Sequence, residues 1–274
     1  MHPLPTQRRR STESLDARQN LLLAALTARE WQRWLPQLEY VDMPAGLVIS
    51  ECGVAMSHAY FPATAMVALL YGTETGDSAE TAIIGNEGMI GTSLFMGGDS
   101  TLSRGVVQSS GHGFRMKASA IKEEIQQPLI LQLLLRYAQA VIAQTLQTAA
   151  CNRHHSLEQQ LCRLLLMTLD RTQGAELVMT HERLSIMLGV RREGVTENAL
   201  KLQDAGLIRY ARGHITALDR PGLEHRACEC YAVVQKEYGR LLPELTAVRS
   251  PFRRDSTQVS RFASPAIPVS RILL

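Results

Sequence analysis

The sequence lacks the features that mark secreted proteins and the commonest enzymes. Its 274 residues include five cysteines, an odd number without paired spacings, which excludes a disulfide framework and is typical of reduced thiols in the cytosol. It contains no Walker loop, no His-Glu-x-x-His segment and no Gly-x-Ser-x-Gly segment, so no local motif supplies a nucleophile or a catalytic metal. We therefore expect a cytoplasmic protein that is not an enzyme.

The chain also has little excess charge and no uninterrupted apolar run of membrane-spanning length. A formal net charge of +3 permits a polyanionic partner without requiring one. The arginines at 8–10 are followed by an apolar run that is too short and too late for a signal peptide. The most apolar stretch, residues 129–150, contains one arginine and four glutamines, which would be costly in hydrocarbon. We expect it to be a buried helix, and we expect no membrane partner.

Changes in composition divide the chain into five segments and predict the α+β fold class. A polar leader is followed by short helical patterns and then by β-rich runs with turn-type clusters at 74–77, 97–99 and 111–113, a texture typical of an antiparallel β-roll. A long helical pattern, a second domain and a basic tail without an apolar face follow. The segments are a disordered leader at 1–18, a β-roll domain at 19–127, a long helix at 128–151, a C-terminal domain at 152–235, and a helix end with a disordered tail at 236–274.

The long helix of residues 128–151 has two apolar faces. Leu133, Leu134, Tyr137 and Val141 form one of them, and the other follows the alternating three- and four-residue spacing of a left-handed helix pair. One face can pack on the β-roll and the other on a second copy of the helix, which gives a two-fold homodimer. A core helix within a single chain is the alternative. The predicted dimer seam consists of Leu131, Leu135, Ala138, Ile142, Thr145 and Ala149.

Residues 180–203 predict a helix, a tight turn and a second helix. Thr180 can cap the first helix, and Gly189 stands where the chain must turn sharply and a positive φ is favoured. Val195 and Ala199 then give the second helix a buried stripe. The charged N-terminal end of the second helix is left facing outward, as in helices that meet the major groove of DNA.

A β-hairpin predicted at 207–218, with Arg212-Gly213 as its turn, completes a winged helix-turn-helix. Arginine can read guanine, a carboxylate can accept a hydrogen bond from cytosine, and the cations of the hairpin can contact phosphates. The pattern therefore predicts binding to double-stranded DNA. A solvated helical hairpin, or a ligand-sensing or protein-interaction module whose winged helix contacts another protein, is the alternative. The candidate DNA-binding residues are Thr180, Arg191, Arg192, Glu193, Thr196, Glu197, Arg209, Arg212 and His214.

The order of these parts resembles the Crp/Fnr superfamily of bacterial transcription regulators. The segment Gly189-Val-Arg-Arg-Glu-Gly-Val is similar to the family's turn and the Arg-Glu step that follows it. The resemblance implies a cyclic-nucleotide-binding-like jelly roll as effector domain, a dimerisation helix and a winged helix-turn-helix. It also implies a sequence-specific regulator that reads a palindromic site as a homodimer, with Arg192 and Glu193 at the bases and RNA polymerase as a candidate partner. Glu197 stands where many relatives have a second arginine, which predicts a different preferred site.

The effector pocket implied by this resemblance departs from the cyclic-nucleotide pattern. Thr92 stands where cyclic-nucleotide binders have a glutamate for the ribose. Arg104 is displaced by one position, which turns a strand side chain to the opposite face of the sheet. We therefore do not expect cyclic nucleotide to bind in the usual way, and the effector is not identified. The candidate pocket residues are Gly91, Thr92, Ser103 and Arg104.

No metal site and no cofactor are expected. The N-terminus lacks the cysteine cluster with which oxygen-sensing relatives hold an iron–sulfur cluster. Three cysteines are interpreted as isolated thiols. Two further cysteines are separated by one residue, whereas metal-binding pairs are commonly separated by two. Two adjacent histidines have no cysteine pair at ligand spacing. These residues, predicted to be packing thiols and a polar hinge, are Cys52, Cys151 and Cys162, then Cys228 and Cys230, and finally His154 and His155.

Overall fold

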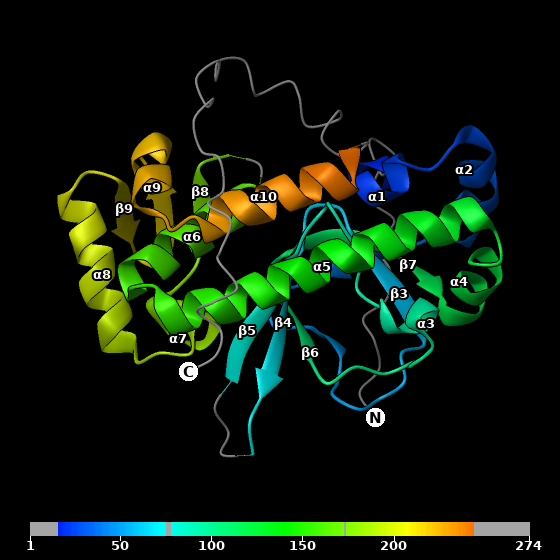
Figure 1. Ribbon diagram of the computed structural model, residues 1–274, viewed down its shortest axis with the longest axis horizontal. Coiled ribbons are helices and arrows are strands. Elements are labelled where there is room, and N and C mark those ends of the chain that lie inside the picture. Colours follow the sequence, from blue (N-terminus) through cyan, green and yellow to red (C-terminus); the bar gives the residue numbers. More distant parts are fainter. Residues whose placement is uncertain (1–15, 75–77, 173, 244–274) are drawn as a thin grey trace, which may run out of the picture.

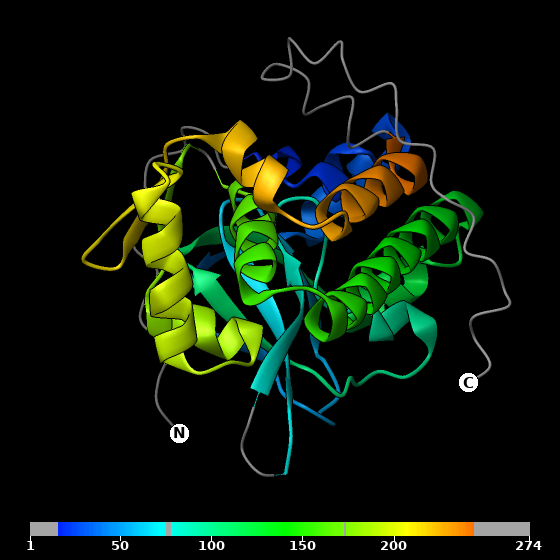
Figure 2. The ribbon, with the colours of Figure 1, turned by 60° about the vertical axis from the view of Figure 1, so that its left-hand side comes forward.

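The computed structural model describes residues 16–74, 78–172 and 174–243, so the predicted tail and most of the predicted leader lie outside the described residues. Helix α5 (Pro128–His154) runs across two lobes, a β-roll and a mainly helical lobe (Figure 1). Helix α10 (Cys230–Leu241) lies alongside α5 in both ribbon views (Figures 1 and 2). The predicted α+β class is confirmed.

Short helices at the N-terminus attach to the β-roll through one buried asparagine. Asn20 caps α1 (Leu21–Ala24), and its amide nitrogen donates to the carbonyl oxygens of Pro62 and Gly88 at 2.8 and 2.7 Å. The predicted leader extends too far, because Ala17 is already buried. The other elements here are the 3₁₀ turns η1 (Ala17–Gln19) and η2 (Leu35–Gln37) and helix α2 (Ala28–Trp34).

Two antiparallel sheets form the β-roll and enclose the larger hydrophobic core. One has the strand order β1-β7-β3 and the other has the order β2-β6-β4-β5. Alternate side chains of each strand point inward, so Phe61, Val67, Ile84, Val107 and Met116 are completely buried. The bounds are β1 (Glu39–Met43), β2 (Val48–Ser50), β3 (His58–Pro62), β4 (Met66–Gly72), β5 (Ser78–Ile84), β6 (Arg104–Ser109) and β7 (Gly111–Lys117), with short helices α3 (Ser93–Met96) and α4 (Ala118–Glu124).

Strand β7 corrects one prediction from the sequence. The predicted turn at 111–113 is wrong, because these residues begin a strand that pairs with both β1 and β3. A Cβ at Gly111 would lie 2.5 Å from the backbone nitrogen of Ala65, and a Cβ at Gly113 would lie 2.6 Å from the carbonyl oxygen of Phe61. The glycines therefore allow two segments of backbone to approach closely, a role that glycine has inside strands as well as in turns.

Helix α5 is longer than the sequence predicts, and one of its faces belongs to the β-roll. It continues past the predicted end at residue 151 to His154, so of the predicted polar hinge His154 is helical and the linker consists of His155 and Ser156. The fully buried hydroxyl of Tyr137 accepts a hydrogen bond from the Met89 backbone nitrogen at 2.9 Å and donates to the Met89 carbonyl oxygen at 2.8 Å. By length and composition α5 could cross a membrane. Its packing on the sheet makes it a core helix of this fold.

The helical lobe has its own core and a small sheet of order β8-β10-β9. Ser156 and Gln159 form a capping box at the start of α6 (Leu157–Leu169). Figure 2 shows α8 on the outer side of this lobe, away from α5. The remaining elements are β8 (Glu176–Val178), α7 (His181–Leu188), α8 (Arg192–Asp204), β9 (Ile208–Ala211), β10 (His214–Ala217) and α9 (Arg220–Arg226).

A buried ion pair joins the two lobes. Nε of Arg171, which follows α6, lies 2.7 Å from Oε1 of Glu87 in the β-roll, and each side chain is 4% exposed. Arg171 also donates to the amide oxygen of Gln144 on α5 at 3.2 Å, and the hydroxyl of Tyr238 on α10 donates to the same oxygen. This network fixes the β-roll and three helices relative to one another.

Candidate nucleic-acid interface

Helices α7 and α8 adopt the predicted helix-turn-helix. The Thr180 hydroxyl caps α7 by accepting a hydrogen bond from the backbone nitrogen of Arg183 at 3.2 Å. Gly189 ends α7 with a φ of +64°, a conformation in which other residues would be strained. Helix α8 then begins at Arg192. Its buried stripe consists of Val195, Ala199 and Leu202.

The N-terminal end of α8 presents three charged side chains to solvent. Arg191, Arg192 and Glu193 are all exposed, and none of them forms an ion pair with another residue among those that the structure describes. No side chain caps this end, so the backbone N–H groups of Arg192 and Glu193 keep no partner among the described residues and carry the partial positive charge of a helix N-terminus. This surface can therefore donate hydrogen bonds from both backbone and side chains to an anionic partner.

The next two predicted residues of α8 already have partners within the protein. The Thr196 hydroxyl donates to the carbonyl oxygen of Arg192 at 3.0 Å and lies 3.0 Å from Nδ1 of His181. Burial, together with the charge of Arg192, lowers the pKa of His181, so its ring is neutral at physiological pH. Nζ of Lys201 lies 2.8 Å from the Glu197 carboxylate and lowers the pKa of Glu197. Both residues are thus less available to a partner than the three before them.

Strands β9 and β10 form the predicted wing. Arg212 and Gly213 have φ values of +50° and +84°, which is the backbone of a two-residue type I′ hairpin turn. Arg209 and Arg212 are both exposed. The ring of Tyr210 stacks on that of His181 with a centroid distance of 4.0 Å. This stacking fixes the wing against the first helix of the helix-turn-helix.

His214 also belongs to the predicted interface, and it has a partner in the small sheet. Its Nδ1 lies 2.7 Å from Oε1 of Glu176 on β8, and the two side chains are 48% and 60% exposed. An exposed pair of this kind is weak, so it can exchange its partner for another anion. The wing therefore offers two arginines that form no ion pair with any described residue, and one histidine that already has a partner.

Comparisons with known proteins agree with this geometry. Residues 159–226 match the family model of the Crp-like helix-turn-helix domain. The chain is similar to the structure of FixK2 from Bradyrhizobium japonicum, with a TM-score of 0.62 and 13% identity over 70% of this chain and 98% of that one. It is also similar to a Crp/Fnr-family transcriptional regulator from Thermus thermophilus, with a TM-score of 0.57 and 23% identity over 69% of this chain and 98% of that one. No curated protein sequence matches the chain.

The chain has the Crp/Fnr fold. Residues 159–226 are its Crp-like helix-turn-helix domain, which begins within α6 and includes α7, α8, the wing and α9. Helix α10 lies beyond the part that the family model matches. The predicted resemblance and the predicted arrangement of β-roll, long helix and winged helix-turn-helix are therefore confirmed.

The predicted effector pocket of this Crp/Fnr fold is almost filled by side chains. It is a cavity of about 30 Å³ between the β-roll and α5, and Tyr137 and Val141 of α5 line one side. That is room for about one or two ordered water molecules, whereas small-molecule sites usually have ~300–1,000 Å³. Gly91, Thr92 and Ser103 line the cavity. Arg104 does not, because its side chain turns outward and pairs with Glu51 at 3.2 Å.

The exposed face of α5 differs slightly from the predicted seam. Leu135, Ile142 and Ala149 are exposed, as a partner-facing stripe requires, but Ala138 is buried against its own chain. At the position after Thr145, Leu146 is 67% exposed, although it is not part of the predicted seam. An unsupercoiled helix has 3.6 residues per turn, so its stripe drifts away from an ideal 3.5-residue repeat. The exposed large apolar side chains of α5 are Leu129, Leu135, Ile142 and Leu146.

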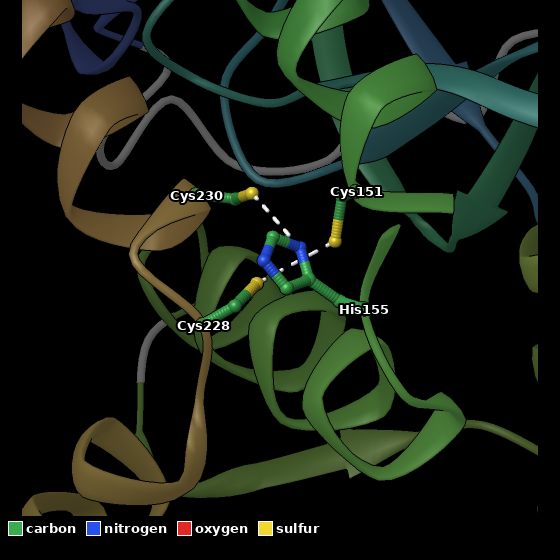
Figure 3. Close-up of side chains that lie close together, drawn as sticks. All are labelled: Cys151, His155, Cys228 and Cys230. Atoms are coloured by element: carbon green, nitrogen blue, oxygen red, sulfur yellow. Dashed lines mark hydrogen bonds between the residues drawn. The ribbon is translucent and has the colours of Figure 1, made fainter. Parts of the chain in front are cut away.

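A cluster of cysteines lies at the hinge, although the sequence does not predict one. Cys151, interpreted as an isolated thiol, has its Sγ 3.5 Å from Sγ of Cys228, which lies 77 residues further along the chain. Figure 3 shows these two residues together with His155 and Cys230. One signal was available, since Cys151 and His155 lie one helical turn apart. Cys162 is buried outside this cluster and Cys52 is exposed.

Proposed function

We propose that this protein is a cytoplasmic transcription regulator that binds duplex DNA sequence-specifically as a homodimer. The observation that carries the proposal is that Arg191, Arg192 and Glu193, at the N-terminal end of α8, are exposed and have no ion-pair partner in the part of the chain that the structure describes. Arginine can donate two hydrogen bonds to O6 and N7 of guanine, and a glutamate can accept one from N4 of cytosine. Helix α8 would therefore read neighbouring base pairs in the major groove.

The wing supplies contacts that position the protein without reading sequence. Arg209 and Arg212 are exposed on a hairpin that Tyr210 holds against α7. Contacts of arginine with phosphate fix the register of a protein on the duplex and make its affinity depend on salt. Thr180, at the cap of α7, is exposed as well and can donate its hydroxyl proton to a phosphate.

A second copy of the chain is the partner that the exposed face of α5 best fits. Three large apolar side chains, Leu135, Ile142 and Leu146, recur along this face at helical spacing, and Leu146 is about two-thirds exposed. Pairing two α5 helices would bury this stripe and relate the two α8 helices by a two-fold axis. Such dimers bind half-sites about one DNA turn apart, ~34–36 Å, so the preferred site would be palindromic.

The effector of this regulator is not a cyclic nucleotide bound in the usual way. The cavity of about 30 Å³ holds no arginine, because Arg104 pairs with Glu51 on the outer surface. A cyclic phosphate would lack its counter-charge there. The β-roll would then influence α5 through packing, as in the contact between Tyr137 and Met89.

Selection of bound duplexes from a random pool tests DNA binding most directly. The wild-type chain should enrich a palindrome, with an affinity that falls steeply between low and moderate salt. Arg192→Ala should lose the enrichment or relax it at one position in each half-site, a change of ~1–3 kcal/mol in discrimination. Arg29→Ala, which removes an exposed arginine on α2, is the matched control and should select the same palindrome.

If neither protein enriches any sequence and affinity does not respond to salt, the proposal is wrong and the winged helix meets a protein partner instead. If both enrich the same palindrome, α8 binds DNA but Arg192 does not read it. Contact with RNA polymerase stays a prediction until a promoter that contains the selected site is transcribed with the protein present.

The dimer has a separate test. Ile142→Glu places a charge in the middle of the exposed stripe and should convert the protein to a monomer in light scattering after size exclusion. Its affinity for the palindrome should fall ~10-fold or more, because two linked half-site contacts become one. Leu102→Glu, at a side chain of the β-roll that is 71% exposed, is the control and should remain dimeric. A wild-type protein that is monomeric at micromolar concentration would contradict the dimer.

A further inference from the structure

Four side chains with metal-ligating atoms converge at the junction between α5 and α10. Cys151 lies in the last turn of α5 and His155 follows that helix directly. Cys228 precedes α10, and Cys230 is its first residue (Figure 3). All three cysteines are buried and the histidine is half-buried. The fold therefore brings together residues from two distant segments at the junction of α5 with α6 and α10.

The distances within this cluster fit a single tetrahedral metal ion. The three sulfur atoms and the nearest ring nitrogen all lie within 4.8 Å of one another. Sγ of Cys151 is 3.5 Å from Sγ of Cys228, and Sγ of Cys230 is 3.4 Å from Nδ1 of His155. Ligands about 2.3 Å from a central zinc ion stand roughly 3.7 Å apart at the corners of a tetrahedron. An iron–sulfur cluster, in which each cysteine binds a different iron atom, requires a wider spacing.

Two neighbouring side chains are placed as supporting groups of a metal site. Nε2 of His155 lies 3.2 Å from the carboxylate of Glu229, which leaves Nδ1 facing the sulfur atoms. A carboxylate on the outer nitrogen is the usual way in which proteins orient a metal-bound histidine. The amide nitrogen of Gln147 donates to Sγ of Cys230 at 3.0 Å, as expected beside a thiolate. Packing of apolar thiols alone requires neither contact.

The buried cation of Arg163 lies beside the turn of α5 that carries Cys151, because its partner Thr148 precedes that cysteine by three residues. Its side chain is buried and donates to the Thr148 hydroxyl at 3.1 Å, but its Nε has no acceptor among the described residues. The nearby carboxyl of Glu80 has its pKa raised to about 7 by burial, so it is only partly ionised at neutral pH. A divalent ion with three thiolates and a neutral imidazole carries one net negative charge. That charge would balance Arg163, whose burial is otherwise costly.

We propose that Cys151, His155, Cys228 and Cys230 bind one zinc-class divalent cation that ties the hinge to the start of α10. Three cysteines and a histidine in tetrahedral arrangement form a closed structural site, with no open position for catalysis. The ion would cross-link the end of α5 to the segment that follows the helix-turn-helix domain. It would thereby fix how that domain is held relative to α5. The site itself does not depend on the proposed function.

Metal content and cobalt substitution of the full-length protein test this proposal. Protein purified under reducing conditions and dialysed should retain about one zinc ion per chain. After removal of metal and addition of Co²⁺ alone, the protein should show the visible bands of a tetrahedral cobalt–thiolate site. Cys228→Ser and Cys151→Ser should lose both signals. Cys162→Ser, at the buried cysteine outside the cluster, is the matched control and should keep them.

Two further measurements separate a metal site from a merely structural cluster. Removal of zinc should lower the melting temperature of the wild type by roughly 5–10 °C, and added Zn²⁺ should restore it, because an ion that binds only the folded state stabilises that state. Glu229→Gln should weaken zinc affinity by ~10–100-fold in competition with a chelator, since it loosens the histidine ligand without removing a donor. Glu224→Gln, on α9, should leave the affinity unchanged.

Each contrary result overturns the proposal in a recognisable way. A wild type that binds no metal in stoichiometric amount, a cobalt spectrum that persists in Cys228→Ser, a Cys151–Cys228 disulfide in the reduced protein preparation, or bound iron with sulfide would each do so. None of these measurements involves DNA. A failure of the metal site therefore leaves the proposed DNA binding untouched, and a failure to bind DNA leaves the metal site standing.

Discussion

An arginine and a glutamate lie close together at two places in this protein, and the surroundings of the two places are opposite. Arg192 and Glu193 stand side by side at the start of α8, and both are exposed and unpaired among the described residues. Arg171 and Glu87 lie 84 residues apart in sequence, and they meet at 2.7 Å with each side chain only 4% exposed. The first two side chains are accessible to a ligand. The buried pair is fixed by the surrounding residues, and it stabilises the contact between the two lobes.

The difference follows from the cost of removing charge from water. Exposed charges keep their hydration and contribute little to stability, whichever partners they have. Buried charges have lost that hydration, so each becomes costly when its partner is removed. The same two residue types therefore produce recognition at one place and attachment of two lobes at the other.

The largest expected effect comes from breaking the buried pair. Arg171→Met leaves the carboxylate of Glu87 buried without its partner, and the free energy of unfolding should fall by ~3–5 kcal/mol in urea titrations followed by circular dichroism. Arg192→Ala, the exposed counterpart, should change it by no more than ~0.5 kcal/mol. The double variant Arg171→Met with Glu87→Leu should recover much of the loss. If Arg171→Met were as stable as the wild type, the junction between the lobes would not depend on this pair.

The contrast also explains which parts of the structure the sequence predicts. The capping box of Ser156 and Gln159, the cap at Thr180 and the turn at Arg212-Gly213 are local patterns, and the structure contains each of them. The Arg171–Glu87 pair and the contact of Cys151 with Cys228 join segments that lie 84 and 77 residues apart. No spacing in the sequence predicts these two contacts, because they form only when the whole chain folds, and folding depends on many weak contacts.

Errors in the sequence analysis have the same origin. Gly111 and Gly113 favour a turn when only neighbours in sequence are considered, yet they lie within β7, where the backbones of Ala65 and Phe61 leave no room for a Cβ. Arg104 shows the opposite case. Its displacement by one residue predicts that it faces away from the pocket, and it does, because alternation along a strand is local.

A second expected effect concerns the buried carboxyl of Glu80 and the pH dependence of stability. Burial raises the pKa of Glu80 to about 7, although Arg163 and Arg171 oppose this, and its Oε2 has no hydrogen bond among the described residues. The unfolded chain releases this proton near its ordinary pKa of about 4.3. Between these values the folded state binds more protons, so stability falls as pH rises through the interval and the full penalty is present above pH 7.

Glu80→Gln removes the cost of ionising this buried carboxyl. The variant therefore tests whether Glu80 differs from Glu87, whose carboxylate has an ion-pair partner. At pH 8 the variant should be more stable than the wild type by an amount on the order of 3 kcal/mol or less, and near pH 4 the two should be alike. Urea titrations at both pH values check this. A variant that is less stable than the wild type at pH 8 would mean that Glu80, like Glu87, acts as an ionised partner of a buried arginine.

The smallest expected effect is at Arg104. Its pair with Glu51 has both side chains half exposed, so Arg104→Gln should change the free energy of unfolding by less than ~0.5 kcal/mol. The same variant tests the nearly filled cavity, because an arginine that turns outward cannot hold a cyclic phosphate inside. Isothermal titration should therefore detect no binding of cyclic AMP or cyclic GMP to either protein. A contrary result would be binding of one of them to the wild type but not to Arg104→Gln. Arg104 would then have to turn inward and the cavity would have to open. The exposed position of this arginine would in that case be one of two states.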